Sequence, residues 1–256
     1  MGSVVTDARE IERVAFVTGA SRGIGRAIAI ALARAGHPIG FCYGSDDAGA
    51  EETRAAIEHE GVKALSVQAD VTAPSAVDAA FSAVESEFGR ITILVNNAGI
   101  SRDGLVARMT DEHWRAVIDT NLTGAFNTIK RATPGMMRER YGRIVNVSSV
   151  VGQMVQAGQA NYAAAKAGLL GLSRSIAREL APRHITCNVV APGPIVTTMT
   201  DEMPAEWQSQ IEAAVPLGRF GTAEECAAVV AFLCSDAASY VTGALVPVDG
   251  GLGMGH

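Results

Sequence analysis

The sequence predicts an α/β fold of the doubly wound type, in which helices cover both faces of a parallel sheet. Short apolar runs alternate with amphipathic helical stretches from residue 13 to about residue 190, and this alternation is typical of βαβ units. A glycine-rich turn joins the first apolar run to the first helical stretch. The chain has 256 residues, of which 48% are hydrophobic and 19% charged. That composition suffices for one large domain with a substantial core.

The elements follow one another regularly. Apolar runs with the length of buried strands lie at residues 14–17, 38–43, 64–67, 91–95, 143–147 and 185–190. Helical patterns lie at residues 24–35, 48–60, 75–88, about 113–138, and 160–180. Gly36 is expected to end the first helix. Residues 244–248 and the turn at residues 249–251 complete the predicted sheet.

No linker or change of composition divides the chain. Residues 1–12 are interpreted as an N-terminal extension and residues 13–256 as a single domain. Residues 192–220 are expected to be irregular, because their prolines are Pro192, Pro194, Pro204 and Pro216. We expect residues of about 193–220 to form a lid over a substrate, and Met199, Met203 and Trp207 suggest that its pocket is apolar.

Composition excludes several function classes. The net charge of −6 provides no basic face, so nucleic acid is not an expected partner. Cys42, Cys187, Cys226 and Cys234 form no C-x-x-C pair and no zinc pattern, so no metal is expected. No apolar signal segment and no membrane-length apolar run occurs, so we expect a cytoplasmic protein without membrane contact.

The glycine-rich turn between the first strand and helix is Thr18-Gly19-Ala20-Ser21-Arg22-Gly23-Ile24-Gly25. Its glycines permit a tight turn and close approach of a pyrophosphate, while the helix N-terminus supplies free N–H groups. We therefore expect a dinucleotide to contact Gly19, Ser21, Arg22, Gly23, Ile24 and Gly25. The glycine spacing, G-x-x-x-G-x-G, differs from the commoner G-x-G-x-x-G.

The same turn permits an alternative. Residues 19–23 also match the G-x-S-x-G elbow of serine hydrolases, with Ser21 as nucleophile. That mechanism needs a histidine base. None of His37, His59, His113, His184 and His256 has a clear catalytic setting in the sequence, so the hydrolase remains a remote alternative.

A tyrosine and a lysine share one face of the helix predicted at residues 160–180. Tyr162 and Lys166 are four residues apart. A nearby ammonium would lower the phenol pKa and make it a usable proton donor or acceptor. An ordinary surface pair is the competing interpretation, although Lys63 and Lys130 are the only other lysines. Ser148 and Ser149 end the fifth strand, where a hydroxyl can bind a carbonyl oxygen or cap a turn.

Together these motifs resemble the short-chain dehydrogenase/reductase family over almost the whole chain. The matching elements are the glycine-rich turn, Asp70-Val71, Asn96-Asn97-Ala98-Gly99, the tetrad Asn121, Ser149, Tyr162 and Lys166, and Pro192-Gly193. The resemblance implies a Rossmann-type sheet with strand order 3-2-1-4-5-6-7 and a homotetramer. It also implies that Asp70, Val71, Asn97, Ala98, Gly99, Tyr162, Lys166, Pro192, Gly193, Ile195 and Thr197 contact the cofactor.

The resemblance also implies a role for each member of the tetrad. Tyr162 is the general acid in reduction, and Ser149 polarises the carbonyl. Lys166 lowers the Tyr162 pKa and holds the nicotinamide ribose, while Asn121 positions a water. Ser149 is preferred to Ser148 because it has the family's spacing of thirteen residues to the tyrosine.

Within the family the sequence is similar to reductases of 3-oxoacyl thioesters carried by acyl carrier protein. The similar segments are residues 97–105, 149–152, 158–162 and 188–193. This implies reduction of a 3-oxoacyl thioester in fatty-acid or polyketide biosynthesis. Carrier protein would dock on Arg131, Arg138 and Arg183, although Pro134 stands where another docking arginine can occur. A reductase of another ketone or secondary alcohol and a noncatalytic cofactor-binding regulator remain alternatives.

The cofactor is expected to be NADP(H) rather than NAD(H). NAD selectivity usually rests on an acidic residue at the end of the second strand, but that strand ends near Gly44, and Asp46 and Asp47 come later. Arg22 lies in the glycine-rich turn, where a guanidinium suits a 2′-phosphate.

Overall fold

The structure is a computed structural model that describes residues 13–196 and 205–254. Thr197, Met199, Met203 and His256 therefore lie outside the described residues. One parallel sheet has the order β3-β2-β1-β4-β5-β6-β7, which confirms the predicted topology. Its strands are β1 Val14–Thr18, β2 Ile39–Tyr43, β3 Ala64–Gln68, β4 Ile91–Asn96, β5 Gly142–Val147, β6 Ile185–Pro192 and β7 Leu245–Val248.

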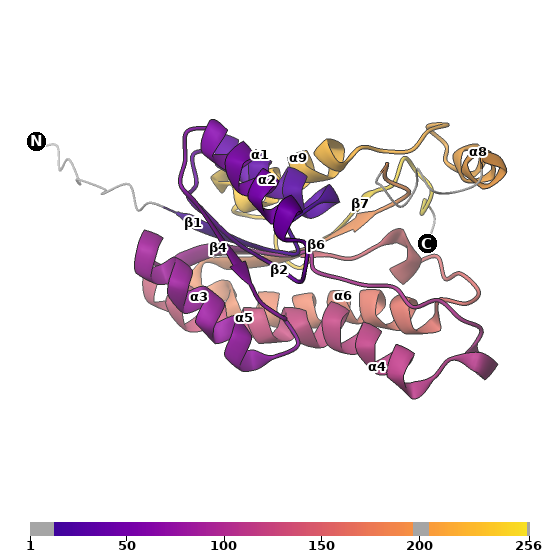
Figure 1. The fold of residues 1–256 in the computed structure, drawn as a ribbon, viewed down its shortest axis with the longest axis horizontal. Coiled ribbons are helices and arrows are strands. Elements are labelled where there is room, and N and C mark those ends of the chain that lie inside the picture. The colour runs from indigo at the N-terminus through magenta and orange to yellow at the C-terminus, as the bar shows by residue number, and fades with distance from the viewer. Residues whose placement is uncertain (1–12, 197–204, 255–256) are drawn as a thin grey trace, which may run out of the picture.

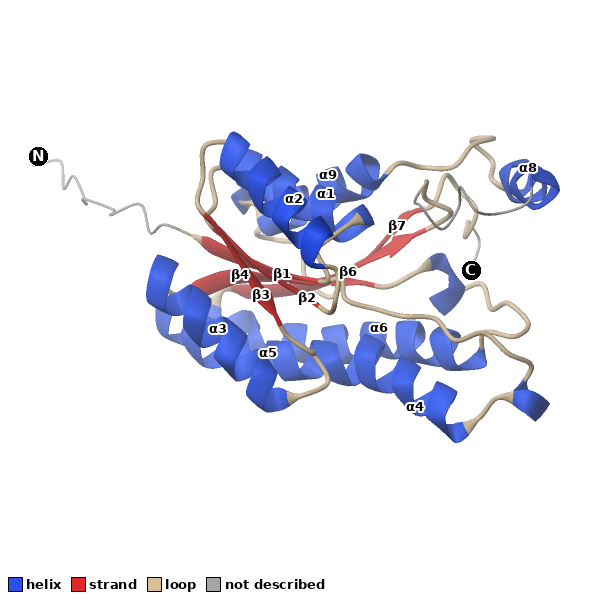
Figure 2. Cartoon of the chain, viewed as in Figure 1, coloured by secondary structure: helices blue, strands red, loops and turns tan. Residues whose placement is uncertain are grey.

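Helices cover both faces of the sheet (Figures 1 and 2). One layer holds α1 Gly23–Arg34, α2 Asp47–His59 and α9 Ala223–Cys234. The opposite layer holds α3 Pro74–Phe88, α5 Gly124–Glu139 and α6 Ala160–Leu180, with α4 Asp111–Ile118 beside α6. Alternate residues of each strand enter different cores: Ala15 and Val17 pack toward α1, whereas Val14 and Phe16 pack toward α3 and α5. Both faces are therefore buried, as a parallel sheet requires.

Two helices differ from the sequence prediction. Residues 192–220 are not irregular throughout, because they contain α8 Ala205–Ala214. The prolines suggested a loop, yet none of them lies between residues 205 and 214. The sequence pattern predicts no element at residues 221–243, but these residues contain α9. Thr222 and Glu225 form a capping box at its start, but the rest of the helix is almost uniformly apolar and lacks a clear helical period.

The long helix expected at about residues 113–138 is interrupted. A π-helical turn at Asp119–Thr123 joins α4 to α5, and the N–H of Gly124 donates to the carbonyl of Asp119. Single π turns occur frequently at functional sites because they change the direction in which one side chain projects. The turn contains Asn121, which is buried.

A chain of buried polar side chains links strands β4 and β5 to helices α5 and α6. The Thr128 hydroxyl donates to Asn96 Oδ1 at 2.5 Å, and Asn96 Nδ2 donates to Asn146 Oδ1 at 2.8 Å. Asn146 Nδ2 in turn donates to Ser173 Oγ at 2.8 Å. Because all of these atoms are paired, the chain fixes α5, β4, β5 and α6 relative to one another.

We expect Asn146→Ala to lower the free energy of unfolding by about 3 kcal/mol, because it leaves the buried amide of Asn96 without its acceptor and opens a small cavity. Denaturant unfolding of the wild type and the variant measures the difference. A loss below about 0.5 kcal/mol, the size expected for a surface substitution, would contradict a stabilising role for this chain.

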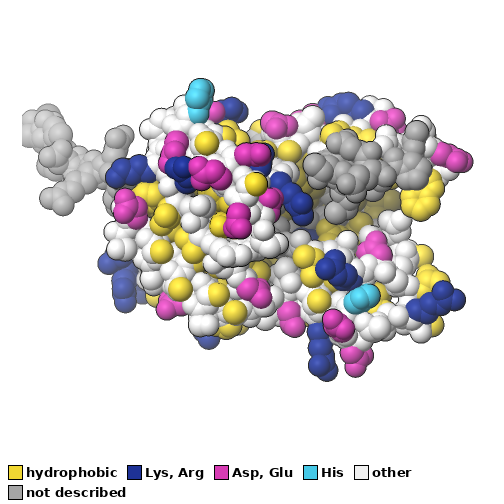
Figure 3. All heavy atoms as spheres, in the orientation of Figure 1, with side chains coloured by type: hydrophobic (Ala, Val, Ile, Leu, Met, Phe, Trp, Pro, Cys, Tyr) yellow, Lys and Arg dark blue, Asp and Glu magenta, His cyan; other side chains and the backbone are white. Residues whose placement is uncertain are grey.

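The surface carries charges of both signs. On the face shown in Figure 3, Lys and Arg side chains are interspersed with Asp and Glu. Among the described helices, none is long and apolar enough to cross a membrane. Within residues 13–196 and 205–254, no group of three or more His, Cys, Asp or Glu side chains is arranged to hold a metal ion. All four cysteines are buried and unpaired.

Candidate active site

A cleft of about 740 Å³ opens at the carboxyl ends of the central strands. Residues after β1, β2, β3 and β4 line it, including Gly19, Asp46, Asp70 and Asn97. In an open parallel sheet, ligands bind at the carboxyl ends of the strands, at the point where the strand order changes direction. Here that point lies between β1 and β4. The cleft therefore lies where the fold class predicts a ligand.

The glycine-rich turn forms a cradle that only glycine can build. Gly19 has φ +66°, and a methyl group added there would lie 2.8 Å from Ala98 Cα. A methyl group on Gly25 would lie 2.2 Å from the Gly19 carbonyl oxygen. No side chain caps the N-terminus of α1. The free N–H groups of the first turn and the close approach of backbone fit a dinucleotide pyrophosphate.

Thr18, which the sequence analysis left out of the site, ties this turn to the segment after β4. Its hydroxyl accepts the N–H groups of Asn97 and Ala98, both at 3.0 Å. The Asn97 side chain returns two bonds, to the carbonyls of Thr18 at 3.1 Å and Gly19 at 2.9 Å. The sequence signal that could have identified Thr18 is a hydroxyl residue at the carboxyl end of the first strand.

The other predicted cofactor residues fall into two groups. Asp70 and Val71 line the cleft, and the Asp70 carboxylate accepts the N–H of Thr72 at 2.8 Å. Pro192, Gly193 and Ile195 lie instead at the end of β6 and just beyond it. There the N–H of Gly193 donates to the carbonyl of Val248 at 3.0 Å.

Ser149 and Ser148 have different surroundings. The Ser148 hydroxyl is buried and donates to the carbonyl of Lys166 at 2.8 Å, which ties β5 to α6. Ser149 is half-buried, its hydroxyl accepts the N–H of Val151 at 3.2 Å, and it lies near enough to the Tyr162 phenol to lower the phenol pKa. The structure thus places Ser149, and not Ser148, beside the phenol.

The pKa of Tyr162 differs from the sequence expectation. Burial raises the pKa of the phenol, the hydrogen bond with Ser149 lowers it, and the Asp103 carboxylate raises it, so that the net direction is upward. Lys166 was expected to lower this pKa, but it is not among the groups that shift it, and burial of the phenol is the largest cause. A raised pKa keeps the phenol protonated at neutral pH, which is the form that donates a proton.

Lys166 is buried one helical turn beyond Tyr162 on α6, with 4% of its surface exposed. Its ammonium donates to the carbonyl of Val147 at 2.8 Å and lies 5.6 Å from the centre of the Tyr162 ring. Burial lowers the pKa of Lys166 from 10.5 to about 8. The side chain therefore lies between the end of β5 and the tyrosine ring.

Asn121 completes the predicted tetrad from the π turn. Its side chain accepts the N–H of Ile100 at 2.8 Å and donates to the carbonyl of Ile100 at 2.9 Å. A methyl group on Gly99 would lie 3.1 Å from Asn121 Oδ1 and 3.4 Å from Lys166 Nζ. Gly99, Asn121 and Lys166 therefore meet at one point, and the amide of Asn121 holds the segment after β4.

The hydrolase alternative lacks its base in this geometry. Ser21 and Asp46 line the cleft together, and none of the residues that line the described cleft is a histidine. His37 and His184 instead precede β2 and β6, at the opposite edge of the sheet. No described group could activate Ser21 as a nucleophile.

The arginines expected to dock an acidic carrier protein differ in availability. Arg131 is bound within its own chain: its guanidinium donates to Asp78 at 2.6 Å and to Glu85 at 2.8 Å, both on α3. It is therefore unsuited to docking. Arg138 and Arg183 are exposed, but they precede β5 and β6. The six residues of β5 separate that edge from Ser149 by about 20 Å.

Comparisons with known proteins agree with this geometry. A family model described as enoyl-(acyl carrier protein) reductase matches residues 19–253. A 3-oxoacyl-[acyl-carrier-protein] reductase of Staphylococcus aureus is 49% identical over 245 residues, which is 96% of this chain and 100% of the relative. The enzymes of the same name from Pseudomonas aeruginosa and Escherichia coli are each 48% identical over 242 residues, covering 94% of this chain and 98% of theirs.

Proposed function

Because the chain belongs to the short-chain dehydrogenase/reductase family, we propose that it reduces a 3-oxoacyl thioester to the 3-hydroxyacyl thioester with NADPH. The relatives named above are 3-oxoacyl-[acyl-carrier-protein] reductases, and they align with nearly the whole chain. The proposal includes a role in fatty-acid biosynthesis, acyl carrier protein as the carrier, and a homotetramer.

One observation carries the proposal: the Tyr162 phenol lies beside the Ser149 hydroxyl, with the Lys166 ammonium behind the tyrosine ring. Two neighbouring hydroxyl groups suit a single carbonyl oxygen, which has two lone pairs to accept from them. The adjacent glycine cradle and the cleft fit a dinucleotide. The combination supports reduction of a carbonyl group.

Ser149, Tyr162 and Lys166 have different roles in the proposed reduction. A bound nicotinamide supplies the hydride that adds to the carbonyl carbon. The Ser149 hydroxyl binds the carbonyl oxygen and stabilises the charge that develops there. The Tyr162 phenol gives its proton to that oxygen and completes the alcohol. Lys166 favours the phenolate left behind because its ammonium lies behind the ring.

The decisive experiment follows nicotinamide absorbance with purified protein and short acyl thioesters. The proposal predicts rapid oxidation of NADPH with an acetoacetyl thioester and none with a crotonyl thioester. Turnover of crotonyl thioester alone would instead assign the activity that the matching family model names, reduction of an enoyl group. Turnover only of other ketones or of secondary alcohols would place the chain elsewhere in its family.

The preference for NADPH rests on Arg22, an exposed residue that lines the cleft beside the glycine-rich turn. We expect Arg22→Ala to weaken NADPH binding about tenfold, because it removes the guanidinium that would bind the 2′-phosphate, and to change NADH binding less than about twofold. Titration calorimetry measures both affinities. Arg34→Ala is the matched control on the same helix, since Arg34 pairs with Glu60 outside the cleft. Equal weakening of both dinucleotides by Arg22→Ala would contradict a phosphate-binding role.

A further inference from the structure

The glycine-rich turn packs directly against the first turn of α2. A methyl group added at Gly49 would lie 2.7 Å from the carbonyl oxygen of Ser21, closer than real side chains approach. Glycine at this position therefore permits the close approach of α2 to the turn. Thr53, one helical turn further along α2, is fully buried at the same contact.

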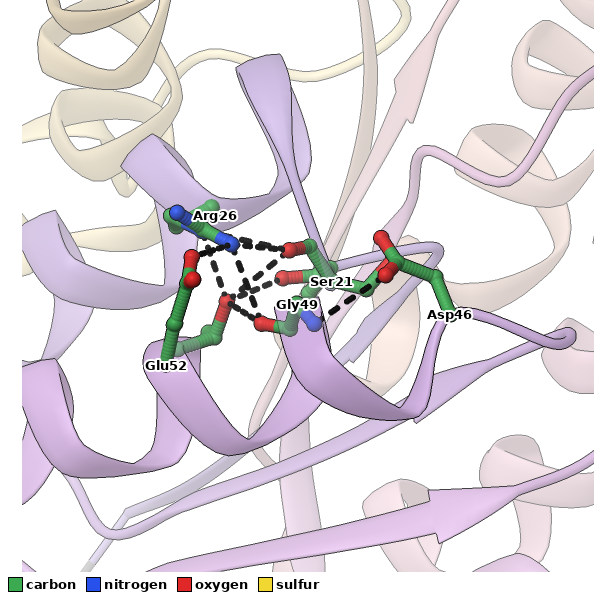
Figure 4. A network of polar contacts seen from close by, with 7 residues as sticks. Ser21, Arg26, Asp46, Gly49 and Glu52 are labelled. Carbon is green, nitrogen blue, oxygen red and sulfur yellow. Dashed lines mark hydrogen bonds and ion pairs between the residues drawn. The ribbon is translucent and has the colours of Figure 1, made fainter.

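Arg26 reaches this contact from α1 (Figure 4). Its guanidinium donates to the carbonyl of Ser21 at 2.6 Å, to the carbonyl of Gly49 at 3.1 Å and to the hydroxyl oxygen of Thr53 at 2.9 Å. The carboxylate of Glu52 pairs with the same guanidinium at 2.9 Å. Arg26 thus joins α1, the glycine-rich turn and α2 in one network.

The Thr53 hydroxyl serves a second carbonyl of the turn. Its oxygen lies 2.9 Å from the carbonyl oxygens of Ala20 and Gly49, and 3.3 Å from that of Ser21. A hydroxyl has only one proton to donate. Because Arg26 already donates to Ser21 and Gly49, the Thr53 proton can go to Ala20. Two consecutive carbonyls of the turn then each have a donor from the helices.

These bonds fix the direction of two peptide groups. A trans peptide is planar, so its N–H points opposite to its carbonyl. The carbonyls of Ala20 and Ser21 are turned toward the contact with α2. The N–H groups of Ser21 and Arg22, two residues that line the cleft, therefore point away from that contact. Arg22 is the N-cap residue of α1, and no side chain caps this helix, so these N–H groups add to the free donors at its N-terminus.

We propose that Arg26 and Thr53 are positioning residues for the dinucleotide, because they hold the glycine-rich turn in the shape that presents its N–H groups to the pyrophosphate. This inference rests on the proposed function, since the dinucleotide is the cofactor of that reaction. Donors that are already in place bind an anion more tightly than donors that must be ordered on binding. Neither Arg26 nor Thr53 lines the described cleft, so both act through the turn and should affect NADH and NADPH alike.

The test is Thr53→Val, which replaces the hydroxyl with a methyl group of similar size. Dissociation constants of NADH and NADPH are measured by calorimetry on the full chain without substrate, and kcat is measured at saturating NADPH. Both dissociation constants should rise about tenfold, because a turn that has lost a donor must be ordered on binding. The value of kcat should change less than about twofold. Thr53→Ser keeps the hydroxyl and should bind both dinucleotides as tightly as the wild type does.

Thr133→Val is the matched control. Thr133 lies on α5 outside the described cleft, and its hydroxyl donates to the carbonyl of Ile129, four residues earlier, at 2.7 Å. Thr53 makes the same kind of bond to Gly49, so the control removes a bond within a helix and leaves the glycine-rich turn untouched. Its dissociation constants for both dinucleotides should equal those of the wild type.

The outcomes separate the two proposals. If Thr53→Val binds both dinucleotides as tightly as the wild type, or if Thr53→Ser or Thr133→Val weakens binding equally, the positioning role is overturned and the proposed reduction stands. A wild type that binds the dinucleotides but reduces no acyl thioester overturns the proposed function alone, since the binding comparison still holds. If Thr53→Val does not fold, Arg26→Lys provides the same test, because it keeps the positive charge but loses the fork that reaches both carbonyls.

Discussion

Tyr162→Phe should lower kcat by about 10³-fold or more, because it removes the proton donor while keeping the aromatic ring. The phenol lies beside Ser149, so its loss also removes one of the two hydroxyl groups proposed to bind the carbonyl oxygen in the transition state. The dissociation constant for NADPH should change less than about twofold. Steady-state turnover of an acetoacetyl thioester and calorimetry of cofactor binding measure the two effects.

Tyr240→Phe is the matched control for this experiment. The Tyr240 side chain is fully exposed, at 102% of its reference area, and it does not line the cleft. Removing its hydroxyl should leave turnover unchanged. Retention of more than a tenth of wild-type turnover by Tyr162→Phe would show that another group donates the proton, and the proposed role of Tyr162 would then be wrong.

Lys166→Met should lower turnover by about 10³-fold, because the phenolate formed by Tyr162 would lose the cation behind its ring. The same substitution should change how stability depends on pH. Burial lowers the pKa of Lys166 from 10.5 to about 8, so between these values the unfolded chain binds a proton that the folded chain does not. The stability of the wild type therefore rises with pH through this range.

The measurement compares the free energy of unfolding of wild type and Lys166→Met from pH 7 to above pH 10, without cofactor. Below pH 8 the buried amine costs the wild type about 3 kcal/mol relative to an uncharged side chain. The free energy of unfolding of Lys166→Met should exceed that of the wild type most at pH 7, and this difference should shrink by about 3 kcal/mol as pH rises. The contributions of the other titrating groups are the same in both proteins and cancel in the difference. Lys63→Met, at an exposed position, should show no such trend, and a flat difference for Lys166→Met would contradict the lowered pKa.

Tyr162 and Lys166 also show which features of the site could be predicted from the sequence. Tyr162 and Lys166 could be placed on one helix face because their spacing matches the helical period, and the helix occurs at the predicted residues 160–180. The direction of the tyrosine pKa could not be predicted. It depends on how completely β5, α6 and the segment around Asp103 remove the phenol from water.

The sequence by itself determined the sheet and the turn that opens it. Alternating apolar runs and helical periods specify βαβ units locally, and the glycines of the turn are required by backbone geometry at Gly19 and Gly25. It did not reveal α9, because exposed positions of this helix such as Ala228 and Phe232 are apolar too, so that no polar face marks its period.

Only the tertiary structure decided which charged side chains remain available to bind a partner protein or a cofactor. Arg131 looks like a docking residue in the sequence, yet Asp78 and Glu85 of α3 bind it. Asp46 looks too distant from the second strand, yet the start of α2 brings its carboxylate against the glycine-rich turn. Spacing along the chain fixes neighbours within one helix or strand, but ion pairs and desolvation depend on which other elements pack there.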